Sequence, residues 1–169
     1  MKVLIAVASK HQSTGEIAIA LGRELSSRGL DVTTANVKNV SALEDYDAVI
    51  LGSAVYLGRW LNEATDFAKK HQESLKRRSV WLFSSGPLGE PLRPLDQPVD
   101  AAFIKDLTAA IGHHLFAGRL ERSHLNLMEK AMTAAAHAPE GDFRDWQEVQ
   151  SWADEIAGLL LKAPEASKK

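Results

Sequence analysis

The chain of 169 residues contains no cysteine, and neither sign of charge dominates it. Without thiols it has no disulfides, cysteine nucleophiles, thiolate metal sites or iron–sulfur clusters. Its 22 acidic residues nearly balance its 20 basic ones, for a formal net charge of −2. Domains that bind nucleic acid are usually basic, so we expect no nucleic-acid partner.

The apolar run at the N-terminus, from Val3 to Ala8, is too short to span a membrane, and no small-residue cleavage site follows it. We therefore expect a cytoplasmic protein with at most peripheral membrane contact. The composition, 45% hydrophobic and 25% charged, is that of an average soluble protein. The length suits a single domain, which we place at residues 1–162, followed by a disordered tail over residues 163–169.

Apolar runs typical of buried strands alternate five times with patterns typical of helices. The predicted strands are residues 3–8, 30–37, 46–55, 79–84 and 114–120. The predicted helices are residues 13–28, 61–75, 100–111, 124–136 and 145–162, two of which end at Gly29 and Gly112. Such alternation predicts an α/β domain with a parallel sheet and helices on both of its faces. Ligands of such sheets bind at the carboxyl ends of the strands, so the loops that follow the strands are the candidate site.

The loop after the first strand, residues 9–14, reads SKHQST and runs directly into a helix. Free amides and the helix dipole favour an anion at that point, and three hydroxyl groups can donate to phosphate oxygens. The loop is neither a Walker loop nor a GxGxxG dinucleotide fingerprint. Ser13 and Glu16 fit a capping box. From these residues alone, an ordinary capped helix is as well supported as a phosphate site.

Two more loops at strand ends have features of a ligand site. Residues 52–60, GSAVYLGRW, place aromatic side chains beside glycines, which suits stacking on a flat ligand. Residues 84–89, SSGPLG, contain glycines that permit close approach of the backbone to a ligand. Each loop also has an ordinary interpretation, which is packing for Trp60 and a plain turn for residues 84–89.

These three loops, in this order, resemble those of the flavodoxins, and the resemblance extends from MKVLIAVAS to DWQEVQSWADEIAGLL near the C-terminus. Within that family the chain is most similar to the branch that contains menaquinone-dependent protoporphyrinogen IX dehydrogenase. The resemblance implies a flavodoxin-like three-layer sandwich around a five-stranded parallel sheet of order 2-1-3-4-5. It also implies that FMN is the cofactor and carries the redox chemistry.

The resemblance further implies which residues bind FMN. The phosphate is expected on the first loop and the isoalloxazine ring between the other two, with Tyr56 a better stacking candidate than Trp60. Gln12 stands where the family usually has glycine, and a positive φ at Gln12 would cost about 1 kcal/mol. The predicted FMN-binding residues are Ser9, Lys10, His11, Gln12, Ser13, Thr14, Ala54, Val55, Tyr56, Leu57, Gly58, Trp60, Ser84, Ser85, Gly86, Pro87, Leu88 and Gly89.

Two functions of different classes follow from the resemblance. The first is an FMN-dependent oxidoreductase that dehydrogenates protoporphyrinogen or a related reduced substrate and passes the electrons to a quinone. The second is an electron carrier between redox partner proteins, without a substrate of its own. A regulatory module that has lost the cofactor is a third interpretation. No catalytic side chain is predicted, because the resemblance assigns the chemistry to FMN. No metal site is predicted, because His113 and His114 are adjacent on a strand and point to opposite faces.

An insertion, residues 119–144, separates the last predicted strand from the last helix. Leu125, Met128, Met132 and Ala135 form a helical stripe within it. This stripe either packs on the body of the domain, or it shapes a site beside the flavin or meets a membrane or a quinone. The branch named above carries an insertion at the same point, associated there with activity, which favours the enzyme.

Overall fold

The computed structural model describes residues 1–56, 58–86, 99–135 and 140–162. Four predicted site residues, Leu57, Pro87, Leu88 and Gly89, lie outside the described residues. The predicted tail, residues 163–169, lies outside them as well.

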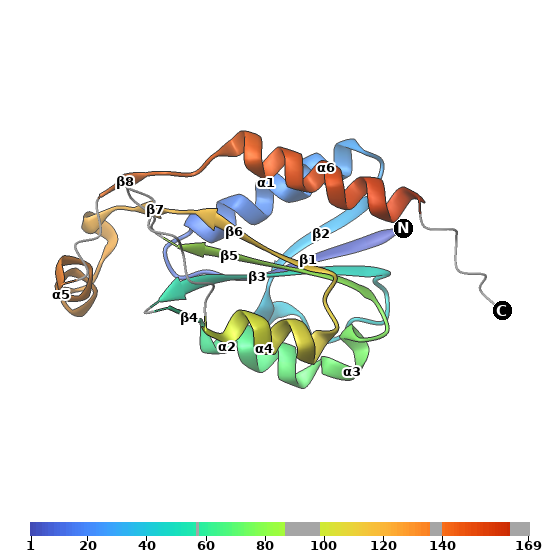
Figure 1. Ribbon diagram of the computed structural model, residues 1–169, viewed down its shortest axis with the longest axis horizontal. Helices are drawn as coiled ribbons and strands as arrows, with labels where there is room; N and C mark the ends of the chain where they lie inside the picture. Colours follow the sequence, from blue (N-terminus) through green and yellow to red (C-terminus); the bar gives the residue numbers. More distant parts are fainter. Residues whose placement is uncertain (57, 87–98, 136–139, 163–169) are drawn as a thin grey trace.

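Five parallel strands make up the central sheet (Figure 1). They are β1 (Lys2–Ala8), β2 (Asp31–Asn36), β3 (Ala48–Tyr56), β5 (Ser79–Gly86) and β6 (Gly112–Ala117). A sixth, short strand, β4 (Arg59–Trp60), pairs antiparallel with the end of β3. The strand order β2-β1-β3-β5-β6 is the predicted order 2-1-3-4-5, so the predicted fold is confirmed.

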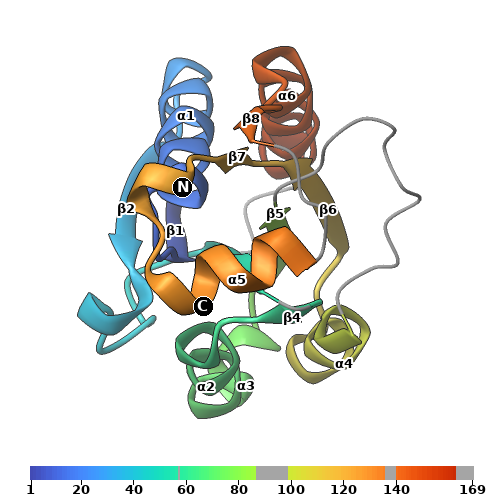
Figure 2. The same ribbon diagram turned by 90° about the vertical axis from the view of Figure 1, so that its left-hand side faces the viewer.

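The three central strands, β1, β3 and β5, are largely apolar because the middle of the sheet is buried on both faces. In β1, Leu4 and Ile5 are both 0% exposed, yet they belong to two different hydrophobic clusters on opposite faces. Helices α1 (Ser13–Ser27) and α6 (Trp146–Lys162) cover the Ile5 face, and α2 (Asn62–Lys70), α3 (Gln72–Leu75) and α4 (Val99–Thr108) cover the other (Figure 2). Within the described ranges, no helix is long and apolar enough to cross a membrane.

Several predicted boundaries were wrong by a few residues. The helix predicted over 61–75 is interrupted at His71 and becomes α2 and α3. The helix predicted to end at Gly112 ends at Thr108, because Ala109 takes the left-handed conformation with a φ of 54°, and Gly112 instead begins β6. The strand predicted over 114–120 is divided between β6 and β7 (Arg119–Leu120).

The insertion after β6 has a paired stem and a helical tip. Strand β7 pairs antiparallel with β8 (Gly141–Asp142), and between them lie the 3₁₀ turn η2 (Arg122–His124) and helix α5 (Leu127–Ala135). Figure 2 looks onto the carboxyl ends of the strands and shows α5 lying across them. The remaining short element, η1 (Val37–Asn39), follows β2 at this same edge.

Candidate functional site

The candidate site lies at the carboxyl edge of the sheet, beside the ends of β1 and β3. Strand β1 is flanked by β2 on one side and by β3 on the other, so the chain order reverses at β1. The loops that leave β1 and β3 consequently diverge to opposite faces. A crevice of this kind is where ligands of open α/β sheets bind.

The loop after β1 has the backbone shape of an anion cradle. Gln12 is in the left-handed region, with a φ of 63°, so the strain expected at this position is present. The amide of Ser13 donates to the carbonyl of His11 at 2.8 Å, which closes a tight turn before α1. The amides of the first helical turn lack helical acceptors and point towards the loop.

Ser9 supplies the clearest evidence that the loop suits an anion. Its hydroxyl oxygen is buried and has no hydrogen-bond partner among the described residues. A buried hydroxyl without a partner is costly in a folded protein. Ser9 stands directly before the turn that opens α1. A phosphate oxygen at this point would accept hydrogen bonds from the Ser9 hydroxyl and from the amides at the start of the helix. Thr14, in the first turn of α1, is 3% exposed. These residues therefore fit a phosphate group.

The predicted capping box of Ser13 and Glu16 was wrong. Gln12 is the N-cap and makes no side-chain cap hydrogen bond, while Ser13 is already helical. The Ser13 hydroxyl oxygen accepts instead from the amide of Arg119 at 3.0 Å. Glu16 pairs with the guanidinium groups of Arg119 and Arg144, at 3.2 and 2.5 Å. Both side chains pair with residues more than 100 positions away in the sequence, so the local capping box does not form.

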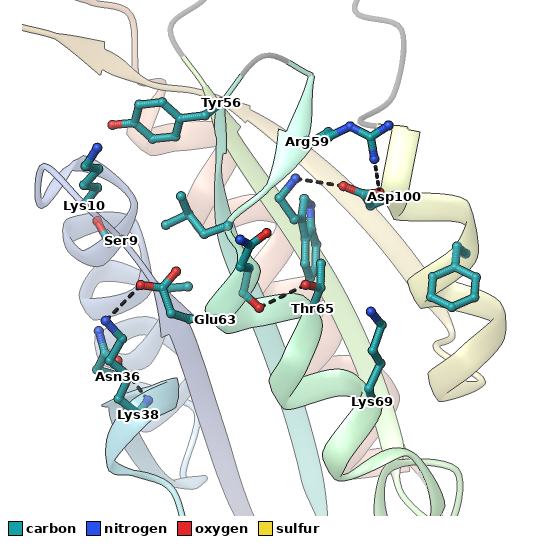
Figure 3. A pocket seen from close by; sticks show the side chains of 15 residues that line it. Ser9, Lys10, Asn36, Lys38, Tyr56, Arg59, Glu63, Thr65, Lys69 and Asp100 are labelled. Atoms are coloured by element: carbon teal, nitrogen blue, oxygen red, sulfur yellow. Dashed lines mark hydrogen bonds and ion pairs between the residues drawn. The ribbon is translucent and has the colours of Figure 1, made fainter. Parts of the chain in front are cut away.

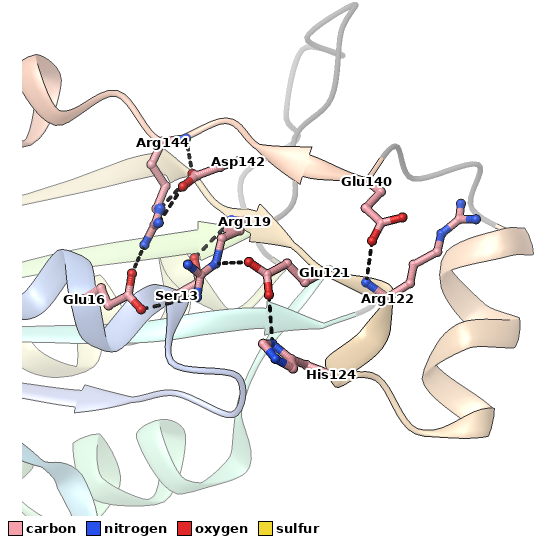
Figure 4. Close-up of polar contacts among 9 residues, drawn as sticks. All are labelled: Ser13, Glu16, Arg119, Glu121, Arg122, His124, Glu140, Asp142 and Arg144. Carbon is pink, nitrogen blue, oxygen red and sulfur yellow. Dashed lines mark hydrogen bonds and ion pairs between the residues drawn. The ribbon is translucent and has the colours of Figure 1, made fainter.

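These contacts fasten the stem of the insertion to α1 (Figure 4). Arg144 has a side chain only 4% exposed and bridges Glu16 and Asp142. The pKa of Arg144 is raised by its hydrogen bonds with Asp142 and Glu16, and the pKa of Glu16 is lowered chiefly by Arg144. The stem of the insertion is therefore tied by ion pairs to the helix that follows the loop of residues 9–14.

The tip of the insertion reaches the same loop through Glu129 of α5. The Glu129 carboxylate is 7% exposed and contacts the Lys10 amine and, at 3.1 Å, His11 Nε2. It also accepts from the amide of Asn126 at 2.9 Å, which caps α5. Burial raises the pKa of Glu129, but the hydrogen bonds from Lys10, the Asn126 amide and His11 outweigh that effect and bring it to about 2. Glu129 is therefore a buried, ionised group.

Sequence reasoning did not identify Glu129, because its neighbours on the loop are 118 residues away. The local signal was present in Asn126 and Glu129, which have the spacing of a capping box. For the predicted apolar stripe of the insertion, packing on the body of the domain is correct at Leu125, which is buried, and wrong at Met128, which is 74% exposed. The side chains of Met132 and Ala135 lie outside the described part of the structure.

Tyr56, at the end of β3, lies beside the cluster formed by Lys10, His11 and Glu129. Its ring centroid lies 6.2 Å from that of His11 and 5.4 Å from the Lys10 amine. Burial, reinforced by the negative charge of Glu129, raises the pKa of Tyr56 to about 12, so its phenol stays neutral. The structure thus brings together predicted residues from the loops after β1 and β3.

Trp60 and Ser84 lie deeper, in a chain of hydrogen bonds. Trp60 is 3% exposed and its indole N–H donates to the Ser84 hydroxyl oxygen at 2.7 Å. The Ser84 oxygen also lies 2.7 Å from His113 Nε2. Burial is the main cause that lowers the pKa of His113 to about 4, so this imidazole is neutral and shares a hydrogen bond with the Ser84 hydroxyl. The side chains of Trp60 and Ser84 are therefore buried in a hydrogen-bonded chain that links β4, β5 and β6.

The remaining described members of the predicted set lie at the carboxyl edge of the sheet. Ala54 and Ser85 are buried, Val55 is half-buried, and Gly58 has a φ of +72°. The carbonyl of Gly86 accepts from the amide of Gly118 at 2.6 Å. Sequence reasoning passed over Gly118.

A cavity of about 820 Å³ opens beside the loop of residues 9–14 and extends along α2 (Figure 3). Ser9, Lys10, Tyr56 and Trp60 of the predicted set line it. Its walls also carry two ion pairs that sequence reasoning did not identify, Lys38 with Glu63 at 2.8 Å and Arg59 with Asp100 at 3.2 Å. The residues that complete the lining are Ala8, Asn36, Leu61, Asn62, Thr65, Lys69 and Phe103.

The two histidines of β6 point to opposite faces, as the strand geometry predicts. His113 contacts Ser84 on one face, and His114 Nε2 lies 3.0 Å from Glu148 of α6 on the other. In the portion of the chain that the structure describes, no three histidine, aspartate or glutamate side chains are grouped to hold a metal ion.

Comparisons with known proteins agree with this geometry. Residues 4–146 match the family model described as "Flavodoxin domain". The chain is 28% identical, over 179 aligned positions, to the protoporphyrinogen IX dehydrogenase [quinone] of Escherichia coli strain K12, covering 96% of this chain and 98% of that protein.

Solved structures share the fold at lower identity. A flavodoxin from an archaeon superposes with a TM-score of 0.64 at 15% identity, covering 95% of this chain and 99% of that one. The rubredoxin oxygen:oxidoreductase of Desulfovibrio gigas gives a TM-score of 0.67 at 15% identity over 95% of this chain, which spans only 36% of that protein's length. With the family model matching most of the sequence, the strand order and the loops of the carboxyl edge lead to one conclusion: the chain belongs to the flavodoxin-domain family.

Proposed function

We propose that this protein is an FMN-dependent oxidoreductase whose phosphate site is the loop of residues 9–14. The observation that carries the proposal is the buried Ser9 hydroxyl, which lacks a partner among the described residues and stands at the N-terminus of α1. FMN ends in a monophosphate, and no dinucleotide glycine pattern is present in the loop. The bound flavin supplies the transfer of electrons, and the protein supplies its position and electrostatic environment.

The protein's own groups are suited to these tasks. Lys10 and His11 bring positive charge to the phosphate loop. Tyr56, at the end of β3, offers an aromatic face at the same edge. The buried chain from Trp60 through Ser84 to His113 fixes the end of β5 beneath the place proposed for the ring.

We further propose that the substrate is protoporphyrinogen or a related reduced compound and that a quinone accepts its electrons. Support comes from the Escherichia coli relative of that name, which aligns over nearly the whole of both chains. The insertion places an additional helix, α5, across the carboxyl edge of the sheet, next to the proposed site (Figure 2).

The alternative function is an electron carrier between redox proteins. It is favoured by the likeness to flavodoxins, which this chain matches over their full length. The two functions differ in whether the insertion is required, so its removal separates them.

The stem shows where to cut. Leu120 pairs with Gly141, and the ion pairs of Arg144 and Arg119 with Glu16 lie outside residues 122–140. Deleting residues 122–140 and joining Glu121 to Gly141 through a short Gly/Ser link leaves the stem intact. We expect the shortened protein to bind FMN and to lose quinone-linked oxidation of protoporphyrinogen. If the full-length protein lacks that activity and reduces a protein acceptor equally well with and without the insertion, the carrier function is correct.

A further inference from the structure

The contact between α5 and the phosphate loop depends on a single carboxylate. Among the described side chains of residues 122–134, only Leu125 and Glu129 are buried. Leu127 and Met128, on the same helix, are 86% and 74% exposed. The stem is held to α1 by several ion pairs, whereas the tip is held to the loop mainly by Glu129 through Lys10 and His11. The tip is therefore the part of the insertion that can be released.

Glu129 pairs with the basic side chains that would otherwise be available to a bound phosphate. Lys10 and His11 belong to the loop whose helix N-terminus and Ser9 hydroxyl fit a phosphate, and both side chains contact the Glu129 carboxylate. A buried anion is stable only while cations or hydrogen bonds compensate its charge. Two anions that share one lysine and one histidine compete for that compensation.

We propose that Glu129 is a built-in competitor of the ligand phosphate, so that phosphate binding to the loop and docking of α5 on it oppose each other. The inference rests on the proposed function, because the phosphate is taken to be that of FMN. Linkage makes the effect reciprocal. Docking of α5 weakens phosphate binding, and phosphate binding weakens the docking of α5 by the same factor. Removing the Glu129 charge removes this competition and strengthens phosphate binding. Glu129 thereby couples cofactor occupancy to the position of the helix that lies across the carboxyl edge.

The variant E129Q tests the competition. A glutamine oxygen can still accept from the Asn126 amide, so the cap of α5 is retained while the charge is removed. E140Q is the matched control, since Glu140 belongs to the same insertion and its hydrogen bond among the described residues is with the amide of Arg122, at 3.1 Å, and not with the loop. Riboflavin, which lacks the phosphate, is the matched ligand.

We expect E129Q to bind FMN about tenfold more tightly than the wild type, the size of a typical coupling between charged neighbours, and to bind riboflavin with unchanged affinity. E140Q should leave both dissociation constants unchanged. Equal changes for FMN and riboflavin, or an FMN affinity that is unchanged or weaker in E129Q, would overturn the proposal.

Hydrogen exchange of the wild-type apoprotein provides a second test that does not involve flavin. Inorganic phosphate should accelerate amide exchange in Leu127–Ala135 relative to chloride at the same ionic strength, with no change in the strands of the sheet. Slower or unchanged exchange in α5 would contradict the competition. If the wild type fails to bind FMN, the proposed function is wrong, and the phosphate experiment still decides whether Glu129 and a phosphate compete.

Discussion

The carboxylate of Glu129 lies 3.1 Å from Nε2 of His11, although 118 residues separate them along the chain. This contact joins the tip of the insertion to the loop at the N-terminus of α1. It places a buried negative charge next to the residues proposed to hold the FMN phosphate, and it makes the insertion part of the site's surroundings rather than a remote appendage.

Replacing Ser9 should separate binding from stability. In S9A the unpartnered hydroxyl is removed, so we expect the free energy of unfolding of the apoprotein to be unchanged or slightly higher. FMN affinity should fall by about 10- to 150-fold, because a hydrogen bond to a charged group contributes about 1.5–3 kcal/mol. Urea unfolding and flavin fluorescence titration measure the two quantities. S27A, at the far end of α1, is the control, and an FMN affinity equal to wild type in S9A would place the phosphate elsewhere.

The two aromatic candidates should behave differently. Y56A should partly restore the fluorescence of bound flavin, because Tyr56 is the aromatic side chain at the rim of the cluster. W60F should mainly lower the free energy of unfolding, by about 1–3 kcal/mol, because it removes the donor to Ser84 and leaves a buried polar group less well satisfied. Fluorescence that recovers only in W60F would reverse this assignment.

Much of this arrangement could be predicted because the signals were local. The apolar run of β1 and the alternation of strands and helices indicated the sheet. Gln12 was singled out through the resemblance, because it stands where the family usually has glycine. Glu16 and Glu129 could not be placed in the same way, since their partners come from distant segments. Packing of the apolar stripe on the domain was wrong at Met128 for a related reason. The inward face of α5 carries Glu129, which pairs with the loop after β1, and the helical periodicity of apolar residues does not reveal such an ion pair.

Gly118 is predicted to be intolerant of a side chain. A Cβ at this position would lie 2.7 Å from the carbonyl oxygen of Gly86 and 2.9 Å from its carbon, and both are backbone atoms. G118A should therefore lower the free energy of unfolding by about 1–3 kcal/mol and weaken FMN binding through displacement of the Gly86 carbonyl. The control is G158A in α6, where a Cβ meets nothing within 4 Å and where we expect stabilisation of about 0.5–1 kcal/mol. Equal stability of G118A and wild type would show that the two backbones can separate freely.

Glu129 should make stability depend on pH in the acid range. Its pKa is about 2 in the folded protein and 4.5 ordinarily, so the folded state binds fewer protons than the unfolded state between these values. The stabilisation is fully present above about pH 4.5 and is lost as the pH falls towards 2. We expect the difference in unfolding free energy between wild type and E129Q to shrink as the pH falls from about 4.5 towards 2. A difference that is the same at every acidic pH would contradict this ion pair.

Identification of the cofactor released from the purified protein tests the central claim most directly. The protein should carry the visible absorption bands of an oxidised flavin, or acquire them when the apoprotein is mixed with FMN. Chromatography after denaturation should then recover FMN in a ratio approaching one per chain. Recovery of FAD, or an apoprotein that does not bind added FMN, would contradict the account.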